Sequence, residues 1–154
     1  MDISTLQLLI RQATPQDVDS IITLTDEAYS RYIPLIGRKP QPMTADYSKM
    51  VVDNTIWLLE ADHQVLGVLV LINEPESMLI YSIAIRPNVQ KQGLGHHLLD
   101  WAEKQARLAG YKTIRLYTNA FFADNIKLYS QLGYEETGHE PLFNSTLVHM
   151  SRNL

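Results

Sequence analysis

The chain has 154 residues, of which 45% are hydrophobic and 19% are charged, and its formal net charge at pH 7 is −4. This composition is typical of one globular domain with a sizeable core, and no apolar run reaches the roughly 18 residues that span a bilayer. The basic residues are scattered, so we expect neither a nucleic acid nor a membrane as partner. The sequence begins without a secretion signal, which favours a cytoplasmic protein. The absence of cysteine excludes disulfides, thiolate metal sites and a cysteine nucleophile.

The first predicted elements are a strand at 6–13 and a helix that begins after Thr14. Pro15 at the first helical position and Asp17 three residues after the cap are typical of a helix N-terminus. The segment 31–47 contains three prolines, so any helix within it should be short. A second helix is predicted at about 44–53.

Three runs rich in Val, Ile and Leu follow, and the short polar turns between them predict an antiparallel meander. These runs lie at 55–62, 64–73 and 78–85. The remaining predicted elements are a helix over 93–109, a strand at 112–119, a helix at about 122–132, and strands near 134–139 and 144–151. The order of strands and helices predicts an α/β fold.

Two glycines, Gly93 and Gly95, lie where the strand at 78–85 gives way to a helix. The first turn of a helix presents free N–H groups and a partial positive charge, which favour phosphate, and glycine lets a phosphate approach the backbone. A tight turn is the alternative interpretation. The two best-known phosphate loops do not fit, because a P-loop has lysine where His96 stands and a dinucleotide loop has glycine where Leu98 stands.

The residues of this junction resemble the Gln/Arg-x-x-Gly-x-Gly/Ala loop of the GCN5-related N-acetyltransferase (GNAT) superfamily. They are Gln90, Lys91, Gln92, Gly93, Leu94 and Gly95. The order of elements is similar as well. The resemblance implies one domain over residues 1–154, with a mixed sheet of about six to seven strands, a splayed strand pair and about four helices. It also implies that the amides from Gln90 to His96 hold the pyrophosphate of acetyl-coenzyme A.

The segment 117–134 extends the resemblance. Family members commonly carry an asparagine, a tyrosine seven residues later, and Leu-Gly-Phe/Tyr at the end of the helix. Tyr129 and the residues 132–134 match this pattern, whereas the position seven before Tyr129 is Phe122. Asn125 is therefore the candidate for the contact with the cofactor. A packed aromatic ring is the alternative interpretation of Tyr129.

The resemblance further implies that the strands 78–85 and 112–119 splay apart, and that the pantetheine arm of the cofactor bonds to the backbone of Ile83 and Ile85. Without cysteine, direct attack by a primary amine on the thioester is the simplest mechanism. Tyr129 is the candidate acid for the departing thiolate, whose thiol has a pKa of about 8.5.

Only about one in 2,500 lysine-like amines is neutral at pH 7, so the amine must lose a proton. Many relatives use a glutamate as the base, but the equivalent position here is Leu79. Tyr81 lies on the same face of the strand and is the candidate base, acting through a water molecule. Tyr32, Arg38 and Tyr47 either line the acceptor pocket or belong to a rigid surface loop.

The expected function is therefore N-acetyl transfer from acetyl-coenzyme A to a primary amine of a small molecule, peptide or protein. A non-catalytic acyl-coenzyme A sensor is the alternative, because the usual glutamate is missing. We expect no metal, since His96 and His97 point to different sides of a helix and His149 sits alone, which suggests a surface or structural role. Short family members often pair, so a homodimer is expected.

Overall fold

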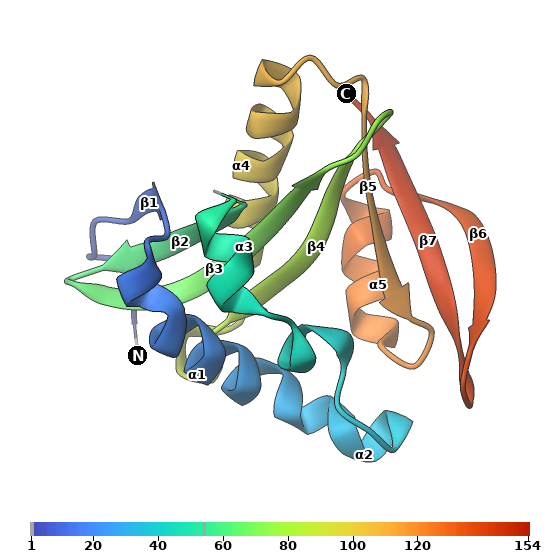
Figure 1. Cartoon of the computed structure of the whole chain (residues 1–154), viewed down its shortest axis with the longest axis horizontal. Helices are drawn as coiled ribbons and strands as arrows, with labels where there is room; N and C mark the ends of the chain where they lie inside the picture. Colours follow the sequence, from blue (N-terminus) through green and yellow to red (C-terminus); the bar gives the residue numbers. More distant parts are fainter. Residues whose placement is uncertain (1, 54) are drawn as a thin grey trace.

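A mixed sheet of seven strands in the order β1-β2-β3-β4-β5-β7-β6 organises the protein, in a computed structural model that describes residues 2–53 and 55–154 (Figure 1). The strands are β1 (Leu9–Gln12), β2 (Ile56–Ala61), β3 (Gln64–Asn73), β4 (Met78–Ile85), β5 (Thr113–Asn119), β6 (Glu135–Leu142) and β7 (Ser145–Asn153). Neighbouring strands run antiparallel except β4 and β5, which are parallel. The predicted mixed sheet and the predicted meander of β2, β3 and β4 are both confirmed.

The helices are α1 (Val18–Tyr29), α2 (Ile33–Ile36), α3 (Tyr47–Val52), α4 (Leu94–Leu108) and α5 (Ala123–Gln131). The α2 helix is one short turn, and the other four helices correspond to the four that the sequence predicts. The α3 helix is shorter than the predicted 44–53, because the preceding residues form a separate 3-10 turn and Asp46 caps the helix by accepting a hydrogen bond from the N–H of Lys49 (3.2 Å). Further 3-10 turns lie at Pro15–Asp17, Ser30–Tyr32 and Pro87–Val89.

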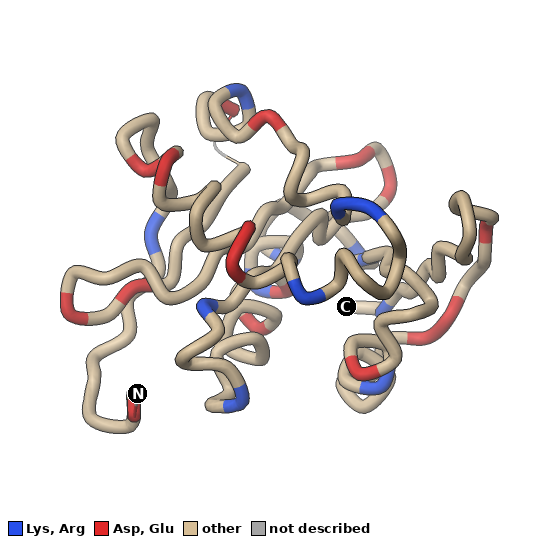
Figure 2. Tube along the Cα trace, turned by 90° about the horizontal axis from the view of Figure 1, so that it is seen from below, with Lys and Arg blue, Asp and Glu red and all other residues tan. Residues whose placement is uncertain are grey.

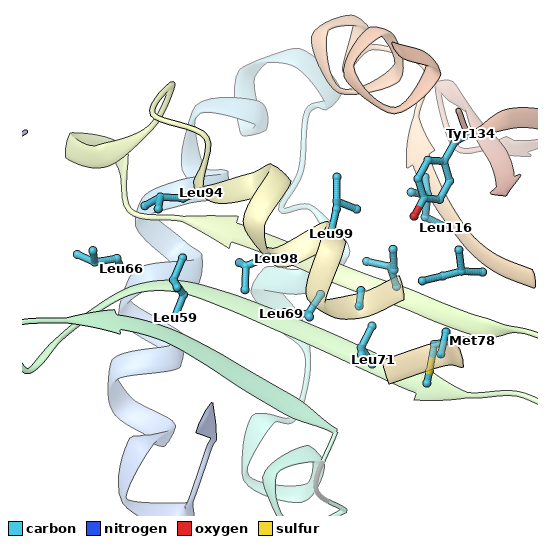
Figure 3. Packing of buried hydrophobic residues seen from close by; sticks show 14 of the residues in the cluster. Leu59, Leu66, Leu69, Leu71, Met78, Leu94, Leu98, Leu99, Leu116 and Tyr134 are labelled. Carbon is cyan, nitrogen blue, oxygen red and sulfur yellow. The ribbon is translucent and has the colours of Figure 1, made fainter. Parts of the chain in front are cut away.

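The larger core lies between α4 and the sheet (Figure 3). The buried residues of α4 recur every three to four positions, which is the spacing of one face of a helix. They include Leu94, Leu98 and Leu99, which pack over strand residues such as Leu59 and Leu69. Both tryptophans, at positions 57 and 101, pack against this core, with ring centroids 5.3 Å apart.

A second core lies on the opposite face of the sheet, beneath α1 and α3. It joins Ile21 and Leu24 of α1, Val51 of α3 and alternating residues of the central strands such as Leu58 and Val68. Burial on both faces explains why β3 is almost continuously apolar rather than alternating. The helices α4 and α1 therefore cover opposite faces of the sheet.

One buried carboxylate ties α4 to the last strand. Glu103 is 5% exposed, and it accepts hydrogen bonds from the hydroxyl of Tyr134 (3.0 Å) and from Nη1 of Arg152 (2.7 Å). Both oxygens of the carboxylate are thus satisfied, as a charge in a core requires. This network holds α4 against β7.

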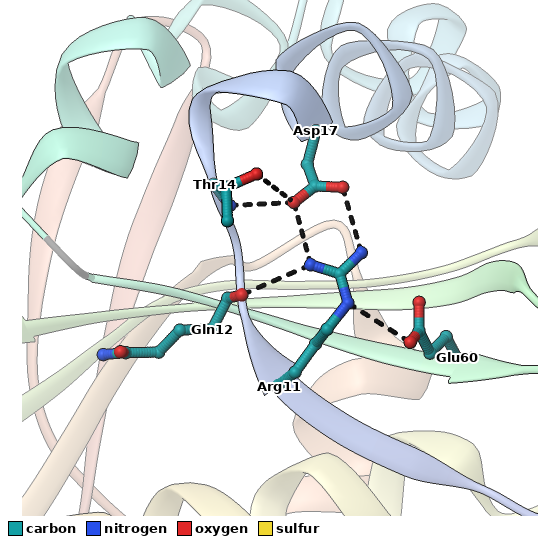
Figure 4. A network of polar contacts seen from close by, with 5 residues as sticks. All are labelled: Arg11, Gln12, Thr14, Asp17 and Glu60. Atoms are coloured by element: carbon teal, nitrogen blue, oxygen red, sulfur yellow. Dashed lines mark hydrogen bonds and ion pairs between the residues drawn. The ribbon is translucent and has the colours of Figure 1, made fainter.

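The N-terminal strand is tied to α1 and β2 by one guanidinium (Figure 4). Arg11 donates to both carboxylate oxygens of Asp17 (2.9 and 3.0 Å) and to Glu60 (3.2 Å). Asp17 also accepts from the N–H of Thr14 (2.8 Å), which is the predicted cap of the helix. These hydrogen bonds, with that of Arg11 first, lower the pKa of Asp17 to about 2.

Acidic and basic positions are interspersed along the trace (Figure 2). None of the helices in the described part of the chain combines the length and the apolar character needed to cross a membrane.

Candidate active site

The parallel strands β4 and β5 are paired over only part of their length. Their register covers Met78 with Ile114, Leu79 with Arg115 and Ile80 with Leu116, and it ends there. Beyond this point β4 continues beside β3, while β5 continues beside β7. The predicted splayed pair is therefore present, and it opens a gap in the middle of the sheet.

A β-bulge lies where the two strands part. Val70 of β3 is opposite Ser82, whereas the next residue, Leu71, is opposite Ile80. Tyr81 is therefore the extra residue of β4. A bulge bends its strand and re-aims the side chain at that point, which accounts both for the divergence of β4 from β5 and for the direction of Tyr81 toward the gap.

A cavity of about 650 Å³ fills the gap. Its walls come from α1, the segment after α2, β4, β5, α5 and the hairpin of β6 and β7. Six segments, drawn from most of the length of the chain, thus converge on the point where two strands separate.

The gap exposes hydrogen-bonding groups of the β4 backbone. The N–H of Arg86 donates to the carbonyl of Leu66 (2.9 Å), and hydrogen-bonded pairs alternate along antiparallel strands. Ser82, Ala84 and Arg86 therefore face β3, whereas Ile83 and Ile85 direct their N–H and C=O groups away from it, toward the gap. The two isoleucines that the sequence analysis selected occupy the gap-facing positions.

Two side chains cap the gap-facing carbonyls. The hydroxyl of Tyr29 donates to the carbonyl of Ile83 (3.0 Å), and Nε2 of Gln90 donates to the carbonyl of Ile85 (3.0 Å). The side-chain oxygen of Gln90 in turn accepts from Arg31 (3.2 Å). These contacts anchor the end of β4 to α1 and to the loop before α4, where β5 no longer pairs with it.

The glycine loop ends at the first turn of α4. Gly93 is the N-cap with a φ of 86°, a left-handed conformation that only glycine adopts without strain, and no side chain caps the helix. Lys91 also has a positive φ, 63°. At Gly95, by contrast, φ is ordinary, and a Cβ would meet no described atom within 4 Å. The protein itself thus does not require glycine at position 95.

The side chains of the loop turn away from the helix start. Oε1 of Gln92 accepts from the N–H of Ile3 (3.1 Å), Leu94 is buried in the core, and His96 points to Asp100 at 3.6 Å. What the loop presents at the start of α4 is therefore its backbone.

Two of the tyrosines in the cavity wall carry hydroxyls for which the described residues provide no hydrogen-bond partner. Tyr129 comes from α5 and Tyr81 from the bulge in β4. Burial, and then the nearby Tyr29 and Tyr32, raise the pKa of Tyr129 above its ordinary value of 10.0. Burial, followed by Tyr117 and Tyr29, raises the pKa of Tyr81 to about 12. Both hydroxyls keep their protons at neutral pH.

The three residues expected in an acceptor pocket are placed differently from one another. Arg38 lines the cavity, with its guanidinium 3.8 Å from the centre of the Phe143 ring. Tyr32 stacks on Phe122 with ring centroids 4.0 Å apart, but it lies outside the cavity wall. Tyr47 is 3% exposed in the core under α1, where its ring fills space between helix and sheet. Arg38 alone of the three lines the cavity.

Asn125 lines the cavity as well, and so does a second asparagine, Asn119, which no sequence pattern had indicated. Asn119 ends β5 and is 5% exposed. Its Oδ1 accepts from the N–H of Phe121 (2.9 Å) and from Ser145 (2.6 Å), while its Nδ2 is buried without a partner among the described residues. The one sequence feature that could have indicated Asn119 is its position as a polar residue at the end of the predicted strand.

His149 corrects a second expectation, because its half-buried side chain does not sit alone. It lines the cavity, its Nε2 lies 2.7 Å from Oε1 of Glu140, and its Nδ1 lies 3.4 Å from Arg115. Arg115 donates to both carboxylate oxygens of Glu74 (2.6 and 2.8 Å). A chain of polar contacts from Glu140 through His149 and Arg115 to Glu74 therefore runs along the cavity wall. Histidine and glutamate come together across a hairpin, which no short spacing in the sequence reveals.

Comparison with known proteins agrees with this architecture. A family model described as "Acetyltransferase (GNAT) family" matches residues 19–134. The N-acetyltransferase YvbK of Bacillus subtilis (strain 168), itself described as uncharacterized, is 31% identical over 101 residues, a match that covers 60% of this chain and 63% of that relative.

Solved structures show the same fold at low identity. The PaiA N-acetyltransferase of Thermoplasma acidophilum, in complex with coenzyme A, superposes with a TM-score of 0.80 at 16% identity, covering 96% of this chain and 99% of that one. The ribosomal-protein-S18-alanine N-acetyltransferase of Escherichia coli gives 0.75 at 18% identity, covering 96% and 94%. With a family match over most of its length and a splayed sheet of the same form, this chain belongs to the acetyltransferase (GNAT) family.

Proposed function

We propose that this protein transfers an acetyl group from acetyl-coenzyme A to a primary amine. The observation that carries the proposal is the splayed gap between β4 and β5, toward which the N–H groups of Ile83 and Ile85 point, together with the uncapped start of α4 that follows β4 in the chain. A long, thin substrate with a phosphate group at one end and amides along its arm fits both features at once.

The start of α4 suits the pyrophosphate. The first-turn N–H groups have no capping side chain, no acidic residue lies in that turn, and the helix contributes a partial positive charge. Gly95 supports the same placement, because its missing Cβ leaves space that no described atom fills. We infer that the backbone from Gln90 to His96 supplies the donors.

The gap suits the pantetheine arm. The N–H groups of Ile83 and Ile85 point toward it, and Asn125 and Asn119 line the same cavity. The unpartnered Nδ2 of Asn119 is a buried donor, and a carbonyl oxygen of the bound arm would satisfy it. A backbone N–H directed at the thioester carbonyl can lower the barrier by about 3 kcal/mol.

In the proposed reaction the amine nitrogen forms a bond to the acetyl carbon, the carbon–sulfur bond breaks, and coenzyme A leaves as a thiolate. Tyr129 is the proposed acid. Its raised pKa keeps the hydroxyl protonated, so it donates a hydrogen bond to the sulfur as negative charge develops there. The proton that it passes to the thiolate to yield the thiol is returned to Tyr129 from water, which in turn takes up the proton that the amine loses.

The proton that the amine loses needs a route to water. With a pKa of about 12, Tyr81 is ionised in only about one molecule in 10⁵ at pH 7. We therefore propose Tyr81 as a neutral relay to a water molecule rather than as a phenolate base. A weakly basic acceptor amine would need this help least.

The experiment that tests the proposal is thiol release from acetyl-coenzyme A in the presence of a broad panel of amines. Amine-dependent release, with the acetylated product confirmed by mass spectrometry, supports an enzyme. Tight binding of acetyl-coenzyme A without transfer to any amine supports the alternative, a non-catalytic sensor, which the missing glutamate at Leu79 favours. Absence of binding, measured by calorimetry, would overturn both.

A cytoplasmic location and a homodimer complete the proposal, and the family resemblance supports the homodimer. The oligomer is tested by light scattering over a range of concentrations. A monomer mass at the highest concentration would rule out the dimer.

A further inference from the structure

The cavity carries positive charge that the protein does not neutralise. Its wall contains three formal cations, Arg38, Lys39 and Arg115, and one carboxylate, Glu140. Arg115 is paired with Glu74 outside the wall, and Glu140 is paired with His149. The two cations that remain stand in contrast to a chain whose formal net charge is −4.

Arg38 is held in place without an anion. Its side chain is half-buried, and its guanidinium lies 3.8 Å from the centre of the Phe143 ring, at the tip of the hairpin of β6 and β7. Neither Arg38 nor the adjacent Lys39 has a carboxylate partner among the residues that the structure describes. Stacking on a ring fixes the plane of a guanidinium and leaves its N–H edge free to bind a carboxylate or a phosphate in bidentate fashion.

The position of Arg38 separates it from the phosphates of the cofactor. The 3-10 turn Gln41–Thr44, which follows Arg38 closely, packs beside α1, and α1 covers the face of the sheet opposite α4. The phosphate-binding start of α4 belongs to the other face. Since the gap passes through the sheet, a cofactor that enters from the side of α4 leaves the side of Arg38 to the acceptor.

We propose that the acceptor is an amine that also bears an anionic group, and that Arg38, with Lys39 beside it, binds that group. This proposal rests on the proposed acetyl transfer. The anionic group is a carboxylate or a phosphate, because the N–H edge of a guanidinium binds both. Arg38 would then determine specificity, since it selects anionic acceptors and orients their amine toward the thioester.

Matched pairs of amines test the proposal. Phenylalanine is compared with phenethylamine, lysine with cadaverine, and O-phosphoethanolamine with ethanolamine. A charge-assisted hydrogen bond corresponds to about ten- to hundredfold in affinity, so the anionic member of at least one pair should have a kcat/KM higher by that factor. Which pairs show the preference distinguishes a carboxylate from a phosphate.

Variants assign the preference to one residue. Arg38→Gln should remove it and leave the KM for acetyl-coenzyme A within about twofold, whereas Arg38→Lys should retain part of it. Arg107→Gln, which removes an exposed cation of α4 outside the cavity wall, is the matched control and should change nothing. A rise in the KM for acetyl-coenzyme A in Arg38→Gln would instead assign Arg38 to the cofactor and overturn the proposal.

Calorimetry separates this proposal from the proposed function. The same pairs are titrated into protein saturated with coenzyme A, so that binding is read without turnover. If no amine is acetylated, the proposed function fails, but an anion preference in binding that Arg38→Gln removes still supports the anion site. Equal binding of both members of every pair, or no binding by any anionic member, overturns it.

Discussion

Gly95→Glu should abolish the binding of acetyl-coenzyme A while leaving the fold intact. Position 95 lies in the first turn of α4, its φ is ordinary, and an added Cβ meets no described atom within 4 Å. A carboxylate near a helix N-terminus is itself favourable, by about 0.3–1 kcal/mol. The free energy of unfolding should therefore stay the same or rise slightly.

The same substitution should weaken the binding of acetyl-coenzyme A. Two negative charges about 4 Å apart repel by about 4 kcal/mol at an effective dielectric constant of about 20, which corresponds to roughly a thousandfold in Kd. The bulk of the glutamate in the space that a phosphate would occupy adds to this penalty. Gly95→Ala, which adds little bulk and no charge, should bind much more tightly than Gly95→Glu.

Calorimetry with acetyl-coenzyme A measures the affinity, and urea denaturation followed by tryptophan fluorescence measures the stability. Gly138→Glu is the matched control, because Gly138 also has an ordinary φ, has room for a Cβ and lies outside the cavity wall. It should bind like the wild type. Wild-type affinity in a folded Gly95→Glu protein would refute the placement of the phosphates at α4.

Three further predictions concern catalysis and stability. Tyr129→Phe should lower kcat by about 10²–10⁴-fold and change the affinity for acetyl-coenzyme A by less than about tenfold; wild-type kcat, measured where chemistry limits the rate, would leave Tyr129 a packing residue. Glu103→Gln should lower the free energy of unfolding by about 2 kcal/mol, because a buried network loses its charge; an unchanged urea midpoint would contradict this. The lowered pKa of Asp17 stabilises the fold above its ordinary value of 3.8, and that stability is lost as the pH falls toward about 2. Asp17→Asn should reduce this loss by about 1 kcal/mol, a small value because the side chain of its partner Arg11 is 40% exposed; equal pH dependence of the urea midpoint in both proteins would refute it.

Local patterns in the sequence were sufficient for the elements and for the glycine turn at the start of α4. The spacing of Leu94 and Leu98 predicted the face of α4 that is buried, and the loop from Gln90 to Gly95 lies at the helix start where it was expected. These features depend on residues within a few positions of each other, since the helical repeat, the cap and the left-handed turn are properties of short segments.

The composition of the cavity was decided by tertiary structure. Tyr47 lies in the same stretch of sequence as Arg38 but fills the core under α1. Asn119 reaches the cavity because β5 diverges from β4, and His149 reaches it because β7 pairs with β5. Glu140 meets His149 only through the register of β6 with β7. Strand pairing, and the residue at which it ends, depends on partners far along the chain. The sequence by itself therefore determined that a glycine-containing turn precedes α4, while only the tertiary structure determined which side chains line the cavity.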